Sequence, residues 1–195
     1  MSDKTEKQKM LAGEIYNYND PELIAARQRA RRLTRAYNQT TEENPEQRVH
    51  ILRELFGTVG PRVEIEPPFR CDYGTNIHAG DNLYMNFGCV VLDCNEVHFG
   101  HDVLLGPNVQ IYTPSHPLDA ELRSTGAEFS RAIRIGNRVW IGGGAILCPG
   151  VTIGDNTTIG AGSVVTRDIP ANVVAAGNPC RIIRHLPGGD SDAKA

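Results

Sequence analysis

Apolar residues recur at every sixth position through much of the chain. In the C-terminal half they stand at Ile135, Ile141, Leu147, Ile153, Ile159 and Val165, and Gly follows at 136, 142, 154 and 160. Short strands, three to a turn, produce a period of six when two residues of each strand face inward and a small residue turns each corner. The pattern therefore predicts a parallel β-helix rather than a helical domain or a sandwich.

The same period continues in two earlier segments. Phe99, Leu105 and Ile111 keep the phase, whereas Ile65, Cys71, Ile77, Leu83 and Cys89 keep the period in a shifted phase. Two positions before the main repeat stands a second set of apolar or small residues: Val97, Val103, Val109, Ile133, Val139, Ala145, Val151, Thr157 and Ser163. Since alternate residues of a strand face one side, both sets should line one interior, in a coil over 59–185.

Residues 1–58 predict helices instead of coil. Asp20 can cap a helix that begins at Pro21. Its apolar stripe is Leu23, Ala26, Ala30, Leu33 and Tyr37. Asn44 and Pro45 predict the start of a second helix that Gly57 ends. We expect this segment to pack on the open end of the coil, and we expect residues 186–195, which have no apolar pattern, to form a mobile tail.

The period fails between Ile111 and Ile133, so residues 112–132 predict a loop inserted into the coil. Loops that interrupt a repeat often carry function. His116 stands between Pro114 and Pro117, and prolines restrict the backbone on either side. An imidazole gains and loses a proton near neutral pH, so His116 is a candidate base.

Charge and composition exclude several classes of partner. The 195-residue chain has a net charge of −3 and a pI of about 6.1, which does not favour nucleic acid or an anionic membrane surface. Its five cysteines form no CxxC motif and suit a reducing compartment. No apolar stretch is long enough to cross a bilayer or to act as a signal peptide. We therefore expect a cytoplasmic protein.

Several motifs appear in order along the chain. They are Pro68-Phe-Arg-Cys-Asp-Tyr-Gly74, Asn86-Phe-Gly-Cys, Gly106-Pro-Asn-Val, Ile111-Tyr-Thr-Pro-Ser-His-Pro117, Val139-Trp-Ile-Gly142, Pro149-Gly-Val-Thr-Ile-Gly-Asp155 and Gly177-Asn-Pro-Cys-Arg181. From Met10 to about Arg184 the chain resembles the maltose and galactoside O-acetyltransferases, and the maltose type most closely. The resemblance implies a left-handed β-helix and a homotrimer. It also implies acetyl transfer from acetyl-CoA to a sugar hydroxyl, such as the 6-hydroxyl of maltose or glucose, in a cleft between subunits.

The chemistry of this transfer requires a base, because a sugar hydroxyl is a poor nucleophile at neutral pH. His116 can take the hydroxyl proton and return it to the CoA thiolate. The resemblance implies that Asn86 stabilises the tetrahedral oxyanion. Glu128, at the end of the same loop, could orient His116, hold its tautomer or accept a sugar hydroxyl, and the sequence leaves these three roles open.

The resemblance also implies two sets of binding residues. Asp72, Tyr84 and Arg27 match positions that contact the acceptor, while Cys94 stands where galactoside-acting members have an acidic residue. For CoA, the matching positions are Trp140, Gly143 and Ala161 along the pantetheine arm, and Thr166, Arg167, Arg181 and Arg184 near the nucleotide phosphates.

Three other functions remain open. The same chemistry could act on a galactoside, a chitin oligosaccharide or lipo-oligosaccharide, or an antibiotic. A non-catalytic scaffold would have no need of His116, Asn86 and the Trp-Ile-Gly coil together. A γ-class carbonic anhydrase shares the coil but holds zinc on three histidines, and His78, His98 and His101 lack its His-x4-His spacing. We therefore expect no metal.

Overall fold

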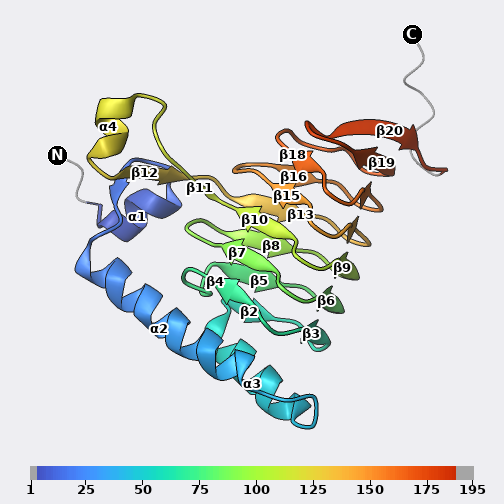
Figure 1. Cartoon of the computed structure of the whole chain (residues 1–195), viewed down its shortest axis with the longest axis horizontal. Helices are drawn as coiled ribbons and strands as arrows, with labels where there is room; N and C mark the ends of the chain where they lie inside the picture. Colours follow the sequence, from blue (N-terminus) through green and yellow to red (C-terminus); the bar gives the residue numbers. More distant parts are fainter. Residues whose placement is uncertain (1–3, 188–195) are drawn as a thin grey trace.

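Short parallel strands wind into a solenoid with three faces (Figure 1). The computed structural model describes residues 4–187. Face I contains β2 (Thr58–Val59), β5 (Ile77–Ala79), β8 (Val97–Phe99), β13 (Ile133–Ile135) and β16 (Thr152–Ile153). Face II contains β3 (Val63–Ile65), β6 (Leu83–Met85), β9 (Val103–Leu105), β14 (Trp140–Ile141), β17 (Thr158–Ile159), β19 (Val173–Ala176) and the antiparallel β20 (Arg181–His185). Face III contains β4 (Arg70–Cys71), β7 (Val90–Leu92), β10 (Gln110–Tyr112), β15 (Ile146–Leu147) and β18 (Val164–Val165).

The six-residue period sets the register between coils. Leu105 lies opposite Ile141 on face II, and Ile111 lies opposite Leu147 on face III. All six apolar residues of the C-terminal repeat are at most 3% exposed, so each coil stacks its large side chains directly on those of the previous coil. The predicted parallel β-helix is confirmed.

The corner between faces I and II uses left-handed backbone. Asn82, Asp102, Arg138, Asn156 and Asn172 have φ between 54° and 58° there. Asn and Asp tolerate this conformation better than other residues that have a Cβ. Their side chains also form rungs: Asn82 Nδ2 donates to Asp102 Oδ1 at 2.7 Å, and Asn156 Nδ2 donates to Asn172 Oδ1 at 2.7 Å.

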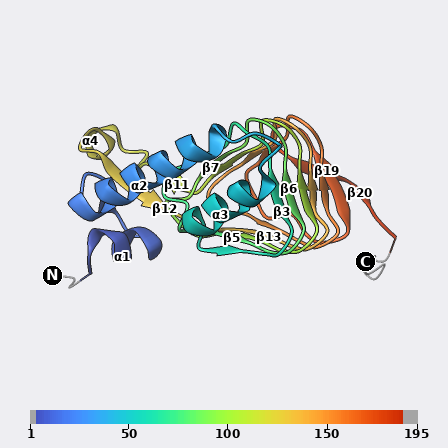
Figure 2. The same cartoon turned by 90° about the horizontal axis from the view of Figure 1, so that it is seen from below.

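Two helices cover the first coil (Figure 2). They are α2 (Pro21–Asn38) and α3 (Pro45–Leu55), and both begin with proline as predicted. Asp20 caps α2 by accepting a hydrogen bond from the Glu22 N–H, whereas the Asn44 side chain makes no such bond to α3. Phe56, which follows α3, packs edge to face on Phe69 with ring centroids 5.7 Å apart.

A third helix, α1 (Glu6–Leu11), was not predicted. It is short, and only Met10 on it is buried, so it presents no apolar stripe in the sequence. Thr5 and Gln8 form a capping box at its start.

The interrupting loop folds as part of a separate lobe. It contains β11 (Pro114–Ser115), α4 (Ala120–Ser124) and β12 (Ala127–Ser130), and β12 also pairs with β1 (Tyr16–Asn17) to make a three-stranded antiparallel sheet. We call α1, β1, β11, α4 and β12 the outer lobe, which projects to one side of the coil in Figure 1. Within this lobe, Ser130 Oγ of β12 donates to the Met10 carbonyl of α1 at 2.7 Å.

Two further observations concern membrane spans and the C-terminal tail. Among residues 4–187, no helix combines the length and apolar character needed to cross a membrane. From residue 188 onward the predicted tail lies outside the described residues.

Candidate active site

His116 follows β11 in the outer lobe and is held by the backbone. Its Nδ1 lies 2.9 Å from the carbonyl oxygen of Ala127. A carbonyl oxygen can only accept a hydrogen bond, so Nδ1 is the donor, and in the neutral imidazole the lone pair is on Nε2. The side chain is 46% exposed, so this lone pair is available to a proton donor in solution or on a bound molecule.

Glu128 approaches His116 on the Nε2 side. Its Oε2 lies 3.6 Å from His116 Nε2, and its Oε1 accepts a hydrogen bond from the Tyr16 hydroxyl. The pairing of β1 with β12 places Tyr16 directly opposite Glu128. The Ala127 carbonyl therefore fixes the histidine tautomer. Glu128 stands where a hydroxyl bound to Nε2 would also meet it.

Asp72 and Arg27 lie in the same region, next to Glu128. Asp72 follows β4, and its Oδ2 accepts a hydrogen bond from Cys94 Sγ at 3.5 Å. Burial raises the pKa of Asp72, and the negative charge of Glu128 raises it further. Arg27 on α2 donates to the Tyr73 hydroxyl at 2.8 Å. The coil, α2 and the outer lobe thus each supply a polar side chain here.

A hollow of about 540 Å³ opens beside this group. Tyr18, His116, Arg123 and Glu128 line it. The Tyr18 carbonyl accepts a hydrogen bond from Arg27 at 2.7 Å, which ties the hollow to α2. Tyr16 and Tyr18 were not predicted, because they stand outside the repeat and outside the motifs. Tyr18 lines the hollow, and the pairing of β1 with β12 places Tyr16 opposite Glu128.

A second group of predicted residues lies along face II. Tyr84 and Trp140 are on β6 and β14, and Leu104 of β9 lies opposite both of them in register. Trp140 is 55% exposed and Leu104 is 47% exposed, so an apolar surface runs down this face.

The corner between faces II and III continues this group. Asn86 turns there after β6, and its Oδ1 accepts a hydrogen bond from the Phe87 N–H at 2.7 Å. Gly143 and Ala161 turn at the same corner of later coils, where the Gly162 N–H donates to the Gly143 carbonyl at 2.9 Å. We call Tyr84, Asn86, Trp140, Gly143 and Ala161 the face II strip. A Cβ on Gly143 would lie 3.0 Å from the Pro107 carbonyl oxygen, so this corner has little space for a side chain.

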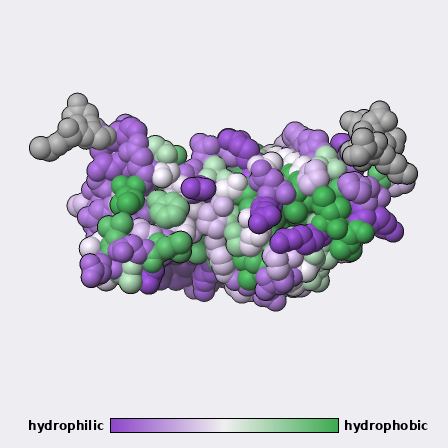
Figure 3. Space-filling view, turned by 90° about the horizontal axis from the view of Figure 1, so that it is seen from above, coloured by the Kyte–Doolittle hydropathy of each residue, from purple (hydrophilic) through white to green (hydrophobic). Residues whose placement is uncertain are grey.

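The residues predicted to meet CoA phosphates fall in two places. Thr166 and Arg167 follow β18 at the corner between faces III and I, the corner from which the outer lobe leaves the coil. Arg181 and Arg184 lie on β20, the last strand of face II. Near them Ile182 and Ile183 are 41% and 65% exposed, and Figure 3 shows apolar surface gathered toward this C-terminal end of the coil.

One chain therefore carries the predicted residues as two separate groups. His116, Glu128, Asp72, Arg27, Thr166 and Arg167 lie around the corner between faces III and I, whereas the face II strip lies across face III from them. Among the described residues, no hydrogen bond or ion pair joins His116 to Asn86.

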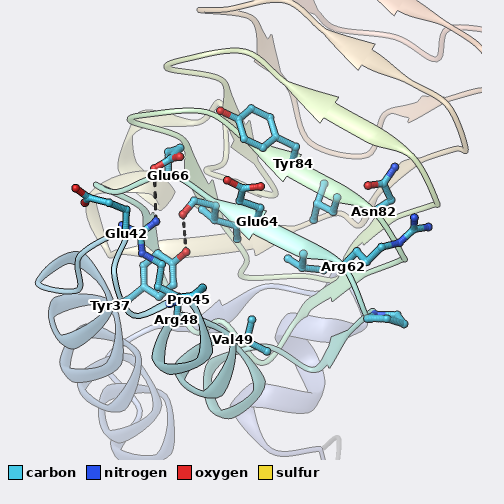
Figure 4. Close-up of a pocket in the computed structure, with 14 residues that line it drawn as sticks. Tyr37, Glu42, Pro45, Arg48, Val49, Arg62, Glu64, Glu66, Asn82 and Tyr84 are labelled. Carbon is cyan, nitrogen blue, oxygen red and sulfur yellow. Dashed lines mark hydrogen bonds and ion pairs between the residues drawn. The ribbon is translucent and has the colours of Figure 1, made fainter.

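Tyr84 also borders a pocket of about 410 Å³ between β3, β6 and the helices (Figure 4). Glu64 and Glu66 of the first coil face this pocket together with Tyr84. Arg48 lies 3.7 Å from the Glu66 carboxylate. The pocket thus places charged side chains beside apolar surface, and it extends the face II strip beyond Tyr84 toward the N-terminal coil.

The histidines of the carbonic anhydrase alternative do not converge as a triad. His101 Nδ1 accepts a hydrogen bond from the Asp81 N–H at 3.0 Å, at the corner between faces I and II. His78 and His98 stack on face I instead, with ring centroids 4.6 Å apart.

Known proteins match the chain closely. The family model "Maltose acetyltransferase hexapeptide capping motif" matches residues 9–60, and "Bacterial transferase hexapeptide (six repeats)" matches residues 132–167.

A galactoside O-acetyltransferase of Escherichia coli (strain K12) is 44% identical over 94% of this chain and 90% of its own length. The crystal structure of a maltose O-acetyltransferase from Clostridium difficile 630 has a TM-score of 0.93 at 52% identity, covering 95% of this chain and 99% of the other. A hexapeptide-repeat acetyltransferase from Vibrio cholerae O1 biovar eltor, complexed with acetyl-CoA, has a TM-score of 0.88 at 39% identity, covering 94% of this chain and 99% of the other.

Proposed function

This chain belongs to the maltose and galactoside O-acetyltransferases and is an acetyl-CoA-dependent acetyltransferase of the hexapeptide-repeat family; we propose that its acceptor is a sugar such as maltose or glucose, acetylated on the 6-hydroxyl. The observation that carries this proposal is the state of His116. Its Nδ1 donates to a backbone carbonyl and its Nε2 faces an open hollow, which is the arrangement that a general base requires.

The proposed step is a direct transfer. His116 Nε2 takes the proton of the sugar hydroxyl while the oxygen attacks the thioester carbon. The tetrahedral intermediate then collapses, so that the C–O bond of the ester remains, the C–S bond breaks and the imidazolium returns the proton to the CoA thiolate. Glu128, 3.6 Å from Nε2, stabilises the transient imidazolium and can accept a hydrogen bond from a neighbouring sugar hydroxyl.

The second half of the site comes from a neighbouring chain in this proposal. Asn86 would stabilise the oxyanion, and the face II strip would hold the pantetheine arm along Trp140, Gly143 and Ala161. The exposed apolar surface of face II supports an assembly that covers part of it. In a cyclic homotrimer, the outer lobe of each chain can meet face II of the next chain. A trimer is the smallest closed ring larger than a dimer.

The acceptor proposal rests on the polar side chains around His116. Asp72, Glu128 and Arg27 offer acceptors and a donor to vicinal hydroxyls. The Cys94 thiol donates a hydrogen bond to Asp72. An acidic residue at position 94 would instead repel the Asp72 carboxylate, so the environment of Asp72 differs from that expected of a galactoside enzyme. All five cysteines are free thiols, which supports a reducing compartment such as the cytoplasm.

A longer acceptor is the second candidate. The pocket beside Tyr84 lies on the side of the face II strip away from Trp140 and the later coils, so a sugar placed at Tyr84 could extend into it. Glu64 and Glu66 would then bind hydroxyl or amino groups of a second unit.

Release of CoA thiol from acetyl-CoA tests the function directly. The acceptor panel contains glucose, maltose, a galactoside, glucosamine and chitin oligosaccharides. We expect the fastest release with glucose or maltose, and loss of at least about 100-fold in kcat for His116→Ala with CoA affinity unchanged. A preference for the oligosaccharides would favour the second candidate. Full activity of His116→Ala would contradict the proposed base.

A further inference from the structure

Three potential metal ligands gather on face I, outside the proposed transfer site. One ring nitrogen from each of His78 and His98 and one carboxylate oxygen of Glu96 all lie within 4.8 Å of one another. His78 is on β5 and His98 is on β8, and the two residues are direct partners in register. From this cluster we propose that His78, Glu96 and His98 bind a divalent transition-metal ion, with zinc as the best match.

The chemistry of the donors selects this class of ion. Two imidazoles and one carboxylate are the ligand set of many three-residue zinc sites, and the fourth position then holds water. Ligand atoms on one zinc are roughly 3.3 Å apart in a tetrahedral site. Atoms of the cluster that lie up to 4.8 Å apart must therefore approach by up to about 1.5 Å, and Glu96 Oε2 and His98 Nε2, at 2.8 Å, must separate slightly. Glu96 and His98 are 45% and 33% exposed at their side chains, which leaves them room to rotate and leaves the ion a path of entry.

The surroundings hold His78 in place. Thr58 Oγ1 lies 3.4 Å from His78 Nδ1, so Nδ1 can donate to this hydroxyl and leave Nε2 for the metal. Gly57 makes space for the ring, because a Cβ at this position would lie 2.7 Å from His78 Cε1.

The hydrogen bond between Glu96 and His98 marks the position that the ion would take. Glu96 Oε2 lies 2.8 Å from His98 Nε2, so one proton now joins two of the three ligands. A metal ion in the same place would replace that proton and add His78 as a third ligand, releasing the proton to solvent.

One nearby charge opposes binding. Arg134 of β13 lies opposite His98 in register and brings a positive charge next to the cluster. Removing this charge should strengthen the affinity for a cation. The proposal thus predicts that some substitutions weaken zinc affinity and that the loss of Arg134 strengthens it. A nonspecific surface histidine would not produce both effects.

A bound ion would join the second coil to the third. His78 and His98 belong to successive coils, so metal binding to the folded chain should raise its thermal stability in proportion to occupancy. The proposal departs from the sequence-based expectation that the protein has no metal, and the cluster lies outside the proposed transfer site.

The experiment is a titration of tag-free, metal-stripped protein with Zn²⁺ by isothermal titration calorimetry, with Tm measured in parallel. We expect one ion per chain. His78→Gln, His98→Gln and Glu96→Gln should each weaken binding by about tenfold or more, and Arg134→Gln should strengthen it a few-fold. Each ligand variant should keep its metal-free Tm near that of the wild type and lose the rise in Tm that zinc causes.

His50 provides the matched control. It pairs with Glu54 at 2.9 Å on α3, so His50→Gln removes an exposed histidine with a carboxylate partner but no second histidine. Zinc affinity should not change in this variant. Absence of one-to-one binding in the wild type, or equal zinc affinity in the wild type and His78→Gln, would overturn the proposal. If one of the ligand variants does not fold, the remaining two decide.

Discussion

At the scale of single residues, the backbone carbonyl of Ala127 performs a task that an acidic side chain performs in many other enzymes. It fixes the protonated nitrogen of His116 at 2.9 Å and turns the other nitrogen toward the hollow. Glu128 is thereby free to act on the acceptor side of the imidazole. Its own position depends on the Tyr16 hydroxyl, which donates to Oε1.

Two substitutions separate these roles. Glu128→Gln keeps the shape of the side chain and removes its charge, so kcat should fall by about tenfold or more as the imidazolium loses its stabilising partner. Tyr16→Phe removes only the hydrogen bond that positions Glu128, so its effect on kcat should be smaller, a few-fold. Steady-state kinetics with a saturating acceptor measures both. Equal losses in the two variants would contradict this division of roles.

Asp93 makes the stability of the fold depend on pH. Its side chain is fully buried and accepts hydrogen bonds from the backbone N–H groups of Asp72, Tyr73 and Asn76. Burial raises the pKa of Asp93 to about 7 from 3.8, and the backbone donors limit the rise. Between these values the folded chain keeps the proton and the unfolded chain releases it. The contribution of this group to the free energy of unfolding is therefore largest below pH 3.8 and falls as the pH rises to about 7.

Asp93→Asn removes this titration. Urea unfolding of both proteins across pH 4 to 7 should show stability of the wild type falling relative to that of the variant as the pH rises. The same pH dependence in both proteins would show that Asp93 does not hold its proton in the folded state.

The sequence predicted His116, Glu128, Asp72 and Arg27, and the structure brings these four residues close together. His116 and Glu128 stand in the loop and Asp72 stands at a corner, where the repeat does not constrain residue type, whereas Arg27 lies on α2. Tyr16 gave no signal. It is a single aromatic residue in a short N-terminal segment, and only its pairing with Glu128, 112 residues away, gives it a place in the site.

At the scale of secondary structure elements, the corners and the strands obey different rules. The strands were predictable because every coil repeats the same spacing and buries the same two positions. The outer lobe was not, because β1, β11 and β12 are two to four residues long and pair across large sequence separations. These segments lie outside the six-residue repeat, so the repeat gave no indication of their pairing.

Arg138 is the exception in the left-handed corner between faces I and II. The other positions with positive φ there are Asn or Asp, whereas Arg138 has φ 54°. Its Nε donates to Asn156 Oδ1 at 2.6 Å, so a shorter side chain with an amide could supply a similar rung. Arg138→Asn should therefore stabilise the fold by about 0.5–1 kcal/mol, which is a rise in Tm of about 1–4 °C. Thermal unfolding followed by circular dichroism tests this, and a lower Tm would mean that the arginine contacts outweigh the backbone strain.

At the scale of the whole molecule, the coil separates the two halves of the proposed site. The outer lobe leaves from the corner between faces III and I, and the face II strip lies beyond the other edge of face III. Sequence motifs identified residues of both halves but could not show that they lie apart in one chain. That separation depends on which corner each coil position occupies, and only the register of the folded coil defines it.

Mixing two inactive variants tests the two-chain site most directly. His116→Ala lacks the base of the outer lobe, and Asn86→Ala lacks the oxyanion donor of the face II strip. Each should be nearly inactive alone. After the two are unfolded together and refolded at equal amounts, about one quarter of the sites should combine an intact outer lobe with an intact face II strip, so activity should recover to about one quarter of that of wild type treated in the same way. No recovery from a mixture that forms mixed oligomers would contradict a site shared between neighbouring chains.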